Sequence, residues 1–491
     1  MSEPKPKTVQ EYIDETPNWS DGTRVSEAPM TSMQWRIWML ATAGKFFEGL
    51  VIFMTGVALP LIVREFGLDA TGKGIVSAAP LFGILIGATA LGGLADRFGR
   101  KAMFILEMAL FVAFLVLVTC SGNFLWLSVG LLGLGLALGC DYPTAHLVIS
   151  ESIPSSFRGR LVLGAFGFQA VGALVGTVIG YLILRDHESL ADWRWMYATA
   201  IGPAVLVTIG RFFIPQSGHW LVAQGRIPEA ERELHRLLDR EPPYPSQFRI
   251  VDPDAEMAKT ADRKPRFAKL FKRKHRRATI LASLPWFLQD LATYGIGIFT
   301  PTILVAAIGG GDSGPARNLA DLIHGDMMAA KGAAFLDALL LVGIVGAIIL
   351  ADRVGRIRLQ ILGFIGCAAG LLLAALSSYA SDPLRLTLIF AGFMLFNFMT
   401  NLGPNAMTYL IAGEVFPTHI RGMGAGFAAS FAKIGAVLTA FLFPILLSHL
   451  GTTTLLFGLV VASLAGAVVT WRFHIETMGV NLEKIDSSEP A

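Results

Sequence analysis

The sequence predicts an all-α membrane protein with twelve transmembrane helices in two six-helix halves, and three observations lead to this prediction. Of the 491 residues, 53% are hydrophobic and only 16% are charged, which is more apolar surface than a water-soluble protein can bury. Apolar runs of about 20 residues, the length that crosses a bilayer, recur along almost the whole chain. Two loop motifs each occur twice, once in either half.

The apolar runs divide the chain into five parts. The predicted spans are 36–61, 74–95, 102–122, 124–149, 160–184, 194–214, 278–306, 329–351, 358–378, 385–412, 421–448 and 453–473. The parts are an N-terminal tail (1–35), a first six-helix half (36–214), a central loop (215–277), a second half (278–473) and a C-terminal tail (474–491).

The distribution of charge predicts the orientation. Residues 263–277 are densely basic and lie between the sixth and seventh runs. Short basic loops stay on the cytoplasmic side, so this loop and, with six spans on either side of it, both termini are expected there. The loops placed outside, 185–192 and 311–326, lean acidic. A basic run can also bind nucleic acid or anionic lipid, but the net charge of +3 gives no reason to expect a nucleic-acid partner.

The two loop motifs repeat at nearly one spacing. The motif D-R-x-G-R occupies 96–100 and recurs 256 positions later at 352–356. The motif E-x6-R-G occupies 151–159 and recurs 263 positions later at 414–422. Parallel duplication of a six-helix half is typical of transporters that bind substrate near the midplane, between the halves.

In their order and spacing these motifs resemble the major facilitator superfamily, and the resemblance covers nearly the whole chain. Residues 215–226 are similar to the stretch that opens the central loop of its sugar-porter-like branch, although Gln216 and Gly218 depart from that pattern. The resemblance implies a transporter that works by alternating access. No phosphate-cradling, paired metal-ligand or nucleophile-elbow motif occurs in the sequence, so neither an enzyme nor a cofactor or metal is expected, and energy should come from an ion gradient.

Charged residues of the repeated motifs are expected to pair at the cytoplasmic helix ends and to gate the alternation between access states. Acids contribute little to the positive-inside rule, so their recurrence favours gating over a role as incidental anchors. Such residues should affect turnover rather than substrate choice. The gating set is Asp96, Arg100, Glu151, Arg158, Asp352, Arg356, Glu414 and Arg421.

Polar residues inside the spans are the candidates for substrate binding, because ionisable groups there are costly. Trp286, Asp290 and Tyr294 follow one another at four-residue spacing, which places them on one helical face. Lys433 is the one cation of its span and needs a carboxylate or an anionic substrate nearby. The alternative is a permanent salt bridge between Asp290 and Lys433 that holds the second half together.

Other ionisable residues in the spans are expected to be structural. Glu107 and Arg211 should lie near cytoplasmic ends and reach the interface, and Asp337 should lie near the outer end of its span. His146 either relays protons or packs between helices, and the second is preferred. The three cysteines, Cys120, Cys140 and Cys367, have no metal-ligand spacing.

Four stretches resemble the phosphate:proton symporter branch of the superfamily. They are 139–143 (GCDYP), 286–295 (W-x3-D-x3-Y-G), 403–418 (GPN, GE and FPT) and 432–436 (AKIGA). By that resemblance the anion would be contacted by Tyr142, Gln169, Trp286, Asp290, Tyr294, Asn405 and Lys433. Proton coupling would involve Glu48, Asp141 and Asp290.

Departures from the phosphate pattern leave the substrate open. Cys140 replaces a glycine, and Val51 stands where relatives carry a second acid, so Lys45 is expected to pair with Glu48 instead. A carrier of an organic anion, such as an aromatic acid or another carboxylate, is therefore the alternative. Hexose and organic-cation carriers fit less well, and a nutrient sensor that does not transport is the alternative of another class.

The expected partners are a small anionic substrate, protons and a lipid bilayer. The chain is predicted to be monomeric and to reside as a multi-pass protein in a cell membrane, with a bacterial inner membrane preferred.

Overall fold

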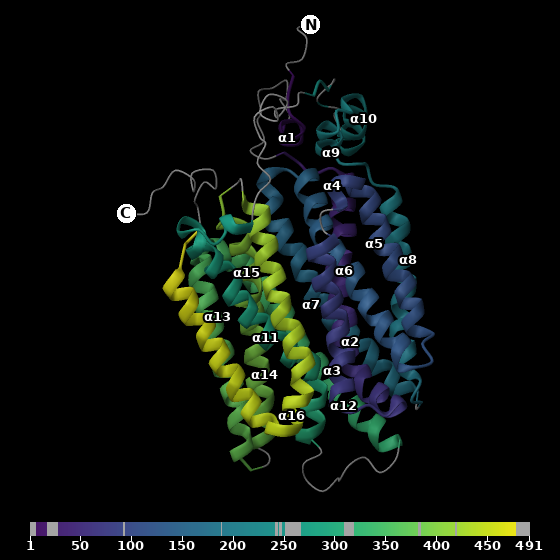
Figure 1. Cartoon of the computed structure of the whole chain (residues 1–491), viewed down its shortest axis with the longest axis vertical. Coiled ribbons are helices and arrows are strands. Elements are labelled where there is room, and N and C mark those ends of the chain that lie inside the picture. The colour runs from purple at the N-terminus through teal and green to yellow at the C-terminus, as the bar shows by residue number, and fades with distance from the viewer. Residues whose placement is uncertain are drawn as a thin grey trace.

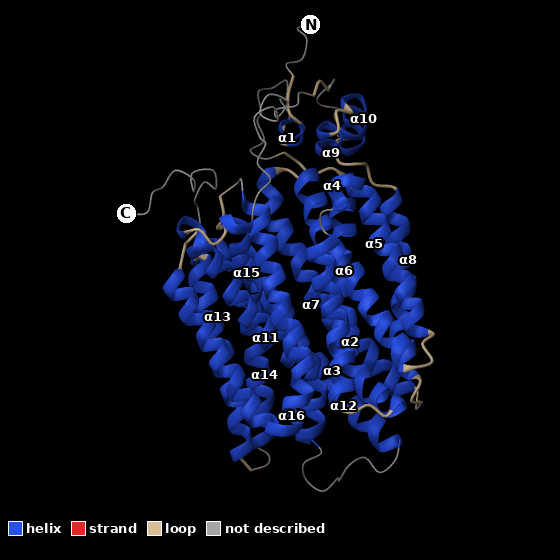
Figure 2. Ribbon diagram, viewed as in Figure 1, coloured by secondary structure: helices blue, strands red, loops and turns tan. Residues whose placement is uncertain are grey.

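The computed structural model describes residues 6–16, 28–91, 94–187, 189–240, 244, 248–250, 267–308, 319–381, 384–417 and 420–477. Within these ranges the chain forms helices and loops, with one isolated β-bridge between Lys7 and Ile250 and no strand (Figure 2).

The helices of the N-terminal tail and the first half come in chain order, and Figure 1 labels those named α. They are α1 (Val9–Ile13), α2 (Ser32–Phe66), α3 (Ala70–Ile86), the π-helical η1 (Gly87–Leu91), α4 (Leu94–Phe98), α5 (Arg100–Thr119), α6 (Phe124–Ser152), α7 (Ser155–Asp186) and α8 (Asp192–Phe212). The central loop contributes α9 (Gly218–Ala223), α10 (Ile227–Leu237) and the short 3-10 helix η2 (Phe267–Lys269). The second half has α11 (Arg273–Ile308), α12 (Leu319–Val354), α13 (Arg356–Leu376), the 3-10 helix η3 (Ser377–Tyr379), α14 (Leu384–Leu402), α15 (Pro404–Glu414) and α16 (Arg421–Phe473).

The predicted all-helical membrane fold is confirmed. In the described residues, nine helices are long and apolar enough to cross a membrane. One of them, α16, has 53 residues and is kinked at Gly451, so it consists of two helical segments. The φ of 77° at Gly451 is one that glycine adopts without steric cost. Helices α8 and α11, which are not among these nine, pack against them, α8 on α5 and α11 on α16. The count of twelve spans and the sides of the two termini remain predictions.

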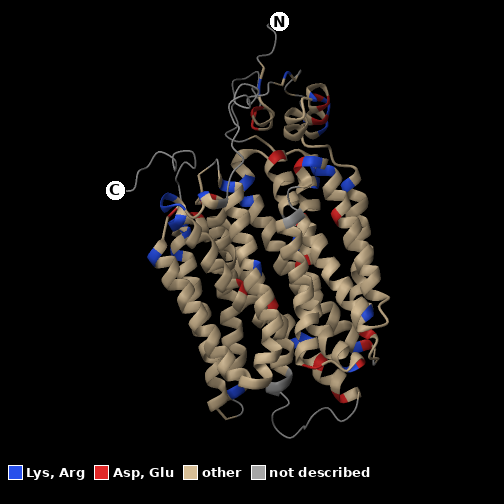
Figure 3. Ribbon diagram, in the orientation of Figure 1, with Lys and Arg blue, Asp and Glu red and all other residues tan. Residues whose placement is uncertain are grey.

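The two halves stand side by side as bundles, with α2 to α8 in one and α11 to α16 in the other; in the view of Figure 1, α12 overlaps the outer part of the first half. They meet where α7 packs on α12, α3 on α16 and α2 on α11. Charged residues gather toward the two ends of the bundle, and few lie in its middle (Figure 3). We call the end that carries the loop motifs and α9 the inner end, and the opposite end, with the bend at Gly451, the outer end.

The halves touch closely between the middle and the outer end. A Cβ atom at Gly56 of α2 would lie 2.4 Å from the carbonyl oxygen of Ile298 in α11. A Cβ atom at Gly74 of α3 would lie 2.4 Å from the carbonyl oxygen of Phe441 in α16. No side chain fits in either place, so the backbones of the two halves are in contact and the outer side is closed.

The N-terminal tail is folded against the inner end of the first half, an arrangement that the sequence analysis did not foresee. Tyr12 is buried, and its main-chain carbonyl and that of Ile13 accept hydrogen bonds from the Arg240 guanidinium, at 3.4 and 2.9 Å. The Asp14 carboxylate accepts hydrogen bonds from the backbone N–H and the hydroxyl of Ser155, both at 2.7 Å. Asp14 thus satisfies an N-terminal amide of α7 from outside the helix.

Gly56→Leu is expected to hold the outer ends apart, because the added side chain meets the backbone of α11. Overpacking of this kind costs about 1–3 kcal/mol, a shift of about 5- to 150-fold in the balance between closed and open states. Spin labels on Asp186 and Leu450, exposed residues at the outer ends of the two halves, should report a longer distance. Gly202→Leu is the matched control, since a Cβ at Gly202 meets nothing within 4 Å; an equal lengthening in the control would contradict the prediction.

Candidate functional site

A cluster of charged residues lies where the two halves meet. Its members come from four helices: Lys45 and Glu48 of α2, Gln169 of α7, Asp290 and Tyr294 of α11, and Lys433 of α16. The four charged side chains are each at most 13% exposed, Tyr294 is buried and Gln169 is partly buried. Gln169 and Tyr294 are neutral, so two lysines face two carboxylates.

Glu48 is shared between the two lysines. Its carboxylate lies 2.5 Å from Lys45 Nζ in the same helix and 3.3 Å from Lys433 Nζ in the other half. Lys433 also lies 3.4 Å from Asp290 Oδ2. The expected pairing of Lys45 with Glu48 and the salt bridge of Asp290 with Lys433 are both present. A buried charge is tolerated only when it is paired. In the order Lys45, Glu48, Lys433, Asp290, each charge has a neighbour of opposite sign.

Tyr294 and Gln169 complete the link between the halves. The Tyr294 hydroxyl donates to Glu48 Oε1 at 3.0 Å and accepts from Lys433 Nζ at 2.7 Å. Gln169 Nε2 donates to the same hydroxyl at 3.0 Å and lies 3.4 Å from Glu48 Oε1. One phenol therefore joins α2 and α7 of the first half to α11 and α16 of the second.

The cluster borders a pocket that collects most of the predicted substrate-binding residues. Gln169, Trp286, Asp290, Tyr294, Asn405 and Lys433 all line it. Asn405 is held from behind: its carboxamide accepts from Gln289 Nε2 at 3.0 Å and donates to Asn401 Oδ1 at 2.6 Å. Tyr142, the remaining predicted contact, lies in α6, but its side chain is outside the described part of the chain.

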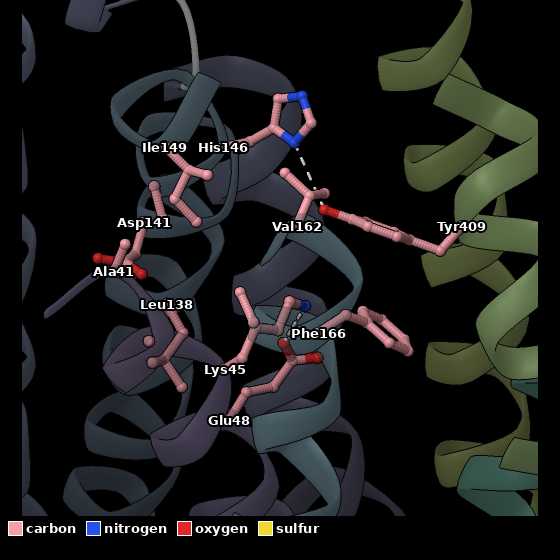
Figure 4. Close-up of a pocket in the computed structure, with 13 residues that line it drawn as sticks. Ala41, Lys45, Glu48, Leu138, Asp141, His146, Ile149, Val162, Phe166 and Tyr409 are labelled. Carbon is pink, nitrogen blue, oxygen red and sulfur yellow. Dashed lines mark hydrogen bonds and ion pairs between the residues drawn. The ribbon is translucent and has the colours of Figure 1, made fainter. Parts of the chain in front are cut away.

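A second pocket lies next to the first, toward the inner end, and Figure 4 shows the residues that line it. Lys45 and Phe166 line both pockets. Most of the other lining residues are small or apolar, namely Ala41, Gly44, Leu138, Ala145, Ile149, Val162 and Ala165. The second pocket is thus a chamber with mainly apolar walls, to which Glu48, Asp141 and His146 add polar groups, and Lys45 lies where it meets the first pocket.

Tyr409 of α15 lines this chamber from the second half (Figure 4). Its ring stacks on Phe166 of the first half, with centroids 4.7 Å apart, and meets Trp286 edge-on at 6.1 Å. Its hydroxyl lies 3.4 Å from His146 Nδ1 of α6 (Figure 4). The second half therefore reaches across the pocket to two helices of the first.

Asp141 has a different partner from the central cluster. It forms an ion pair of 2.5 Å with Arg211 of α8, whose side chain is fully buried. The guanidinium donates to the carbonyl oxygen of Phe104 at 2.6 Å and lies over the Phe104 ring, 3.4 Å from its centroid. Glu107 is 2% exposed and accepts a hydrogen bond of 2.7 Å from the Thr144 hydroxyl.

The expectation that Glu107 and Arg211 reach the membrane interface is therefore wrong. Both side chains point into the first half, where Arg211 neutralises Asp141 and caps two main-chain carbonyls. Their positions near the ends of predicted spans gave no indication of this, because the direction of a side chain depends on which helices pack around it.

The loop motifs form matching ion pairs in the two halves. Arg100 pairs with Glu151 at 3.0 Å and with Asp96 at 2.9 Å. In the repeat, Arg356 pairs with Glu414 at 3.3 Å and with Asp352 at 2.8 Å. Each set of pairs stays within its own half.

The other two arginines of the gating set are placed differently. Within the described residues Arg158 forms no ion pair with Glu151, and the acid that acts on its guanidinium is Asp14 of the N-terminal tail. Arg421 Nε donates to the carbonyl oxygen of Phe416 at 3.1 Å. The predicted meeting of Glu151 with Arg158 is thus not found in this structure.

Two residues that follow each half also bind its loop motifs, and the sequence analysis missed the repeat that these residues form. The Ser217 hydroxyl donates to Glu151 at 2.5 Å, and the Thr477 hydroxyl donates to Glu414 at 2.5 Å. Gln216 accepts from the backbone N–H of Lys101, and Glu476 accepts from that of Arg356. Ser217 and Thr477 are 260 positions apart, and so are Gln216 and Glu476. This spacing lies between the offsets of 256 and 263 positions of the two loop motifs, so it could have revealed the repeat.

Arg211→Leu is expected to destabilise the protein by about 3–5 kcal/mol, because it leaves Asp141 buried without its cation. The fall in melting temperature of the purified protein measures this. Adding Asp141→Asn should recover most of the loss, since the uncompensated charge is then gone. Arg185→Leu, at an exposed ion pair with Asp186, is the control and should change stability by at most about 1 kcal/mol.

Three curated relatives match the chain nearly end to end. The inner membrane metabolite transport protein YgcS of Escherichia coli is 29% identical over 94% of this chain and 95% of its own length. The niacin transporter NiaP of Acinetobacter baylyi is 26% identical over 94% and 99%. A putative inorganic phosphate transporter of Schizosaccharomyces pombe, C1683.01, is 24% identical over 94% and 89%.

Solved structures and a family model agree with these relatives. A structure of XylE of E. coli, described as a major facilitator superfamily proton:xylose symporter, superposes with a TM-score of 0.70 at 18% identity, covering 93% of this chain and 99% of the other. The model of the family "Sugar (and other) transporter" matches residues 37–488. The chain therefore belongs to the sugar (and other) transporter family, and it is a multi-pass membrane transporter of the major facilitator fold rather than an enzyme.

Proposed function

We propose that this chain is a proton-coupled symporter of a small anion, with inorganic phosphate as the first candidate. The observation that carries the proposal is the buried cluster in which Glu48 and Asp290 are paired with Lys45 and Lys433 between the halves. A site between the halves is the one place that alternating access can expose to either side in turn.

The donors of the first pocket suit an oxyanion. Lys433 and Lys45 supply positive charge, and Tyr294, Gln169, Trp286 and Asn405 supply hydrogen-bond donors. Dihydrogen phosphate also carries O–H groups, which the Asp290 carboxylate can accept. One carboxylate among several donors favours this partly protonated form over a fully ionised one.

The balance of charge couples the anion to a proton. The four charged groups of the cluster sum to zero when all are ionised. A bound anion adds one negative charge to a buried site, and protonation of Glu48 or Asp290 removes it. Anion and proton therefore each make the other bind more tightly, which is the coupling a symporter needs.

Asp141 offers the first half a further proton site. Asp141 and Glu107 place two carboxyl groups in the same buried region, and Arg211 can neutralise only one of them. Asp141 also borders the second pocket, so a proton held in this region can reach the chamber beside Lys45. The description of XylE as a proton symporter lends support to coupling of this kind.

An organic anion is the second candidate, and the second pocket favours it. The ionised group of a carboxylate can bind at Lys45, while an apolar body occupies the chamber against Phe166 and Tyr409 (Figure 4). Both candidates have a named relative, a phosphate transporter for the first and a niacin transporter for the second.

We also propose that the paired charges of the loop motifs set the rate of alternation. Because each set of pairs stays within one half, it holds the inner helix ends of that half together as a rigid unit. The set comprises Asp96, Arg100 and Glu151 in the first half and Asp352, Arg356 and Glu414 in the second. Arg158 and Arg421, placed elsewhere here, belong to it only if they pair in another access state.

Uptake of radiolabelled phosphate into proteoliposomes with an inward proton gradient tests the main proposal. Lys433→Ala leaves Asp290 without its cation, and Asp290→Asn leaves two lysines with the single carboxylate of Glu48. Each variant thus leaves one uncompensated buried charge, which costs about 2–5 kcal/mol, so uptake should fall by about 30-fold or more. Asp186→Asn, at an exposed ion pair, should leave uptake unchanged. No gradient-driven phosphate uptake by folded wild-type protein would exclude phosphate, and the same liposomes would then be tested with nicotinate and benzoate.

Arg100→Gln is expected to lower the maximal uptake rate by about 5- to 150-fold, corresponding to a change of about 1–3 kcal/mol, without a comparable change in the substrate concentration at half-maximal rate. Arg97→Gln is the control, because Arg97 is exposed in the same motif and its guanidinium rests on Phe98 rather than on a carboxylate. If the half-maximal concentration rose while the rate stayed constant, the residue would act on binding, and the gating role would be wrong.

A further inference from the structure

Asp337 is a buried carboxyl that the substrate site does not use. It lies in α12, is 4% exposed, and contacts the Thr177 hydroxyl of α7, so the contact joins the two halves. Thr177 follows Gln169 by eight residues toward the outer end, a distance of about 12 Å along the helix. The contact therefore lies between the central cluster and the outer end, in the region where the halves are closed.

The hydrogen bonds at Thr177 indicate which protonation states the contact can hold. Thr177 Oγ1 lies 3.0 Å from the carbonyl oxygen of Ala173 and 2.8 Å from Asp337 Oδ2. A hydroxyl has a single proton to donate. When Thr177 donates it to Asp337 Oδ2, the contact also holds for an ionised carboxylate; when Thr177 donates it to Ala173, the contact requires that Asp337 is protonated and donates its own O–H to Thr177. The closed contact therefore accommodates a neutral carboxyl without leaving a donor unused.

No cation compensates an ionised Asp337 in the described structure. The helices that pack on α12 are α2, α7, α11, α13, α14 and α15. Their ionisable residues within the bundle include Lys45, Glu48, Tyr181, Asp290, Tyr294, Cys367 and Tyr409. Among the described residues none of these interacts with Asp337, whose one partner is Thr177. An ionised carboxylate in such a place is costly.

We propose that Asp337 is a proton-binding site on the outer side and that its protonation allows the outer end to close. When the halves separate there, α7 leaves α12, and Asp337 meets water and can ionise. To close again, the carboxyl must first take a proton from the outer solution. Because the proton returns to the same side when the outer end reopens, this site changes the balance between access states and not the number of protons carried with substrate.

The direction of the pH effect follows from this scheme. Protonated Asp337 favours the state with the outer end closed, and ionised Asp337 favours the state with it open. Acid outside should therefore shift the protein toward the closed outer end. The inference depends on alternating access but on neither the identity of the anion nor the residues that bind it.

The test measures the distance between spin labels on Asp186 and Leu450 in the full-length protein in lipid nanodiscs, with the exposed Cys120 replaced by serine. In otherwise wild-type protein the population with the longer distance should grow as the pH is raised from about 5.5 to about 8.5, the range over which a buried carboxyl titrates. Asp337→Asn, which cannot ionise, should keep the shorter distance throughout. Asp326→Asn removes the other buried carboxyl of α12 and should retain the wild-type response.

Two results would overturn the inference. One is a wild-type distance distribution that does not change with pH, and the other is a change of the same size in Asp337→Asn. Asp337→Ala, which also cannot ionise, answers the same question if the asparagine variant does not fold. No substrate is added, so failure of this experiment is separate from failure of the phosphate assay.

Discussion

The shared pairing of Glu48 with Lys45 and Lys433 is the interaction on which the arrangement of the two halves depends. Lysine and glutamate are rarely buried unless paired, and here one of the two partners of Lys433, Glu48, comes from the opposite half. The halves are therefore held in register at the middle of the bundle by electrostatic need as well as by packing. A ligand that neutralises Lys433 in place of Glu48 would weaken the link between the halves at the moment it binds.

This central link differs in kind from the charges at the inner end. Arg100 and Arg356 pair with acids of their own halves, and the tail residue Asp14 adds a further contact within the first half. Such pairs stiffen each half without joining it to the other. The halves are joined instead by helix packing toward the outer end and by side-chain contacts that include the central cluster, Tyr409 against Phe166, and Asp337 against Thr177. Rigid halves joined by breakable contacts are what a rocking motion requires.

Features that repeat along the chain could be predicted from the sequence, and features that depend on neighbouring helices could not. Apolar runs and duplicated motifs led to the fold, and helical spacing placed Trp286, Asp290 and Tyr294 around one pocket. The same reasoning paired Lys45 with Glu48 because they share a turn. It failed for Arg211 and Glu107, since distance from the end of a span says nothing about which side of the helix is buried. It also missed the folded N-terminal tail, whose burial depends on the distant Arg240.

Val51 stands where phosphate symporters carry a second acid, and Lys45 lowers the negative charge of the site further. Without Lys45, the cluster of Glu48, Asp290 and Lys433 would carry one negative charge and would repel an anion until a carboxyl was protonated. With Lys45 the same cluster is neutral, so one proton suffices to accommodate one added negative charge. The loss of an acid at Val51 and the presence of a lysine at position 45 act in the same direction, because both reduce the negative charge that an anion must meet. The electrostatic balance of the site therefore supports the proposed anion, although its acids differ from the phosphate pattern.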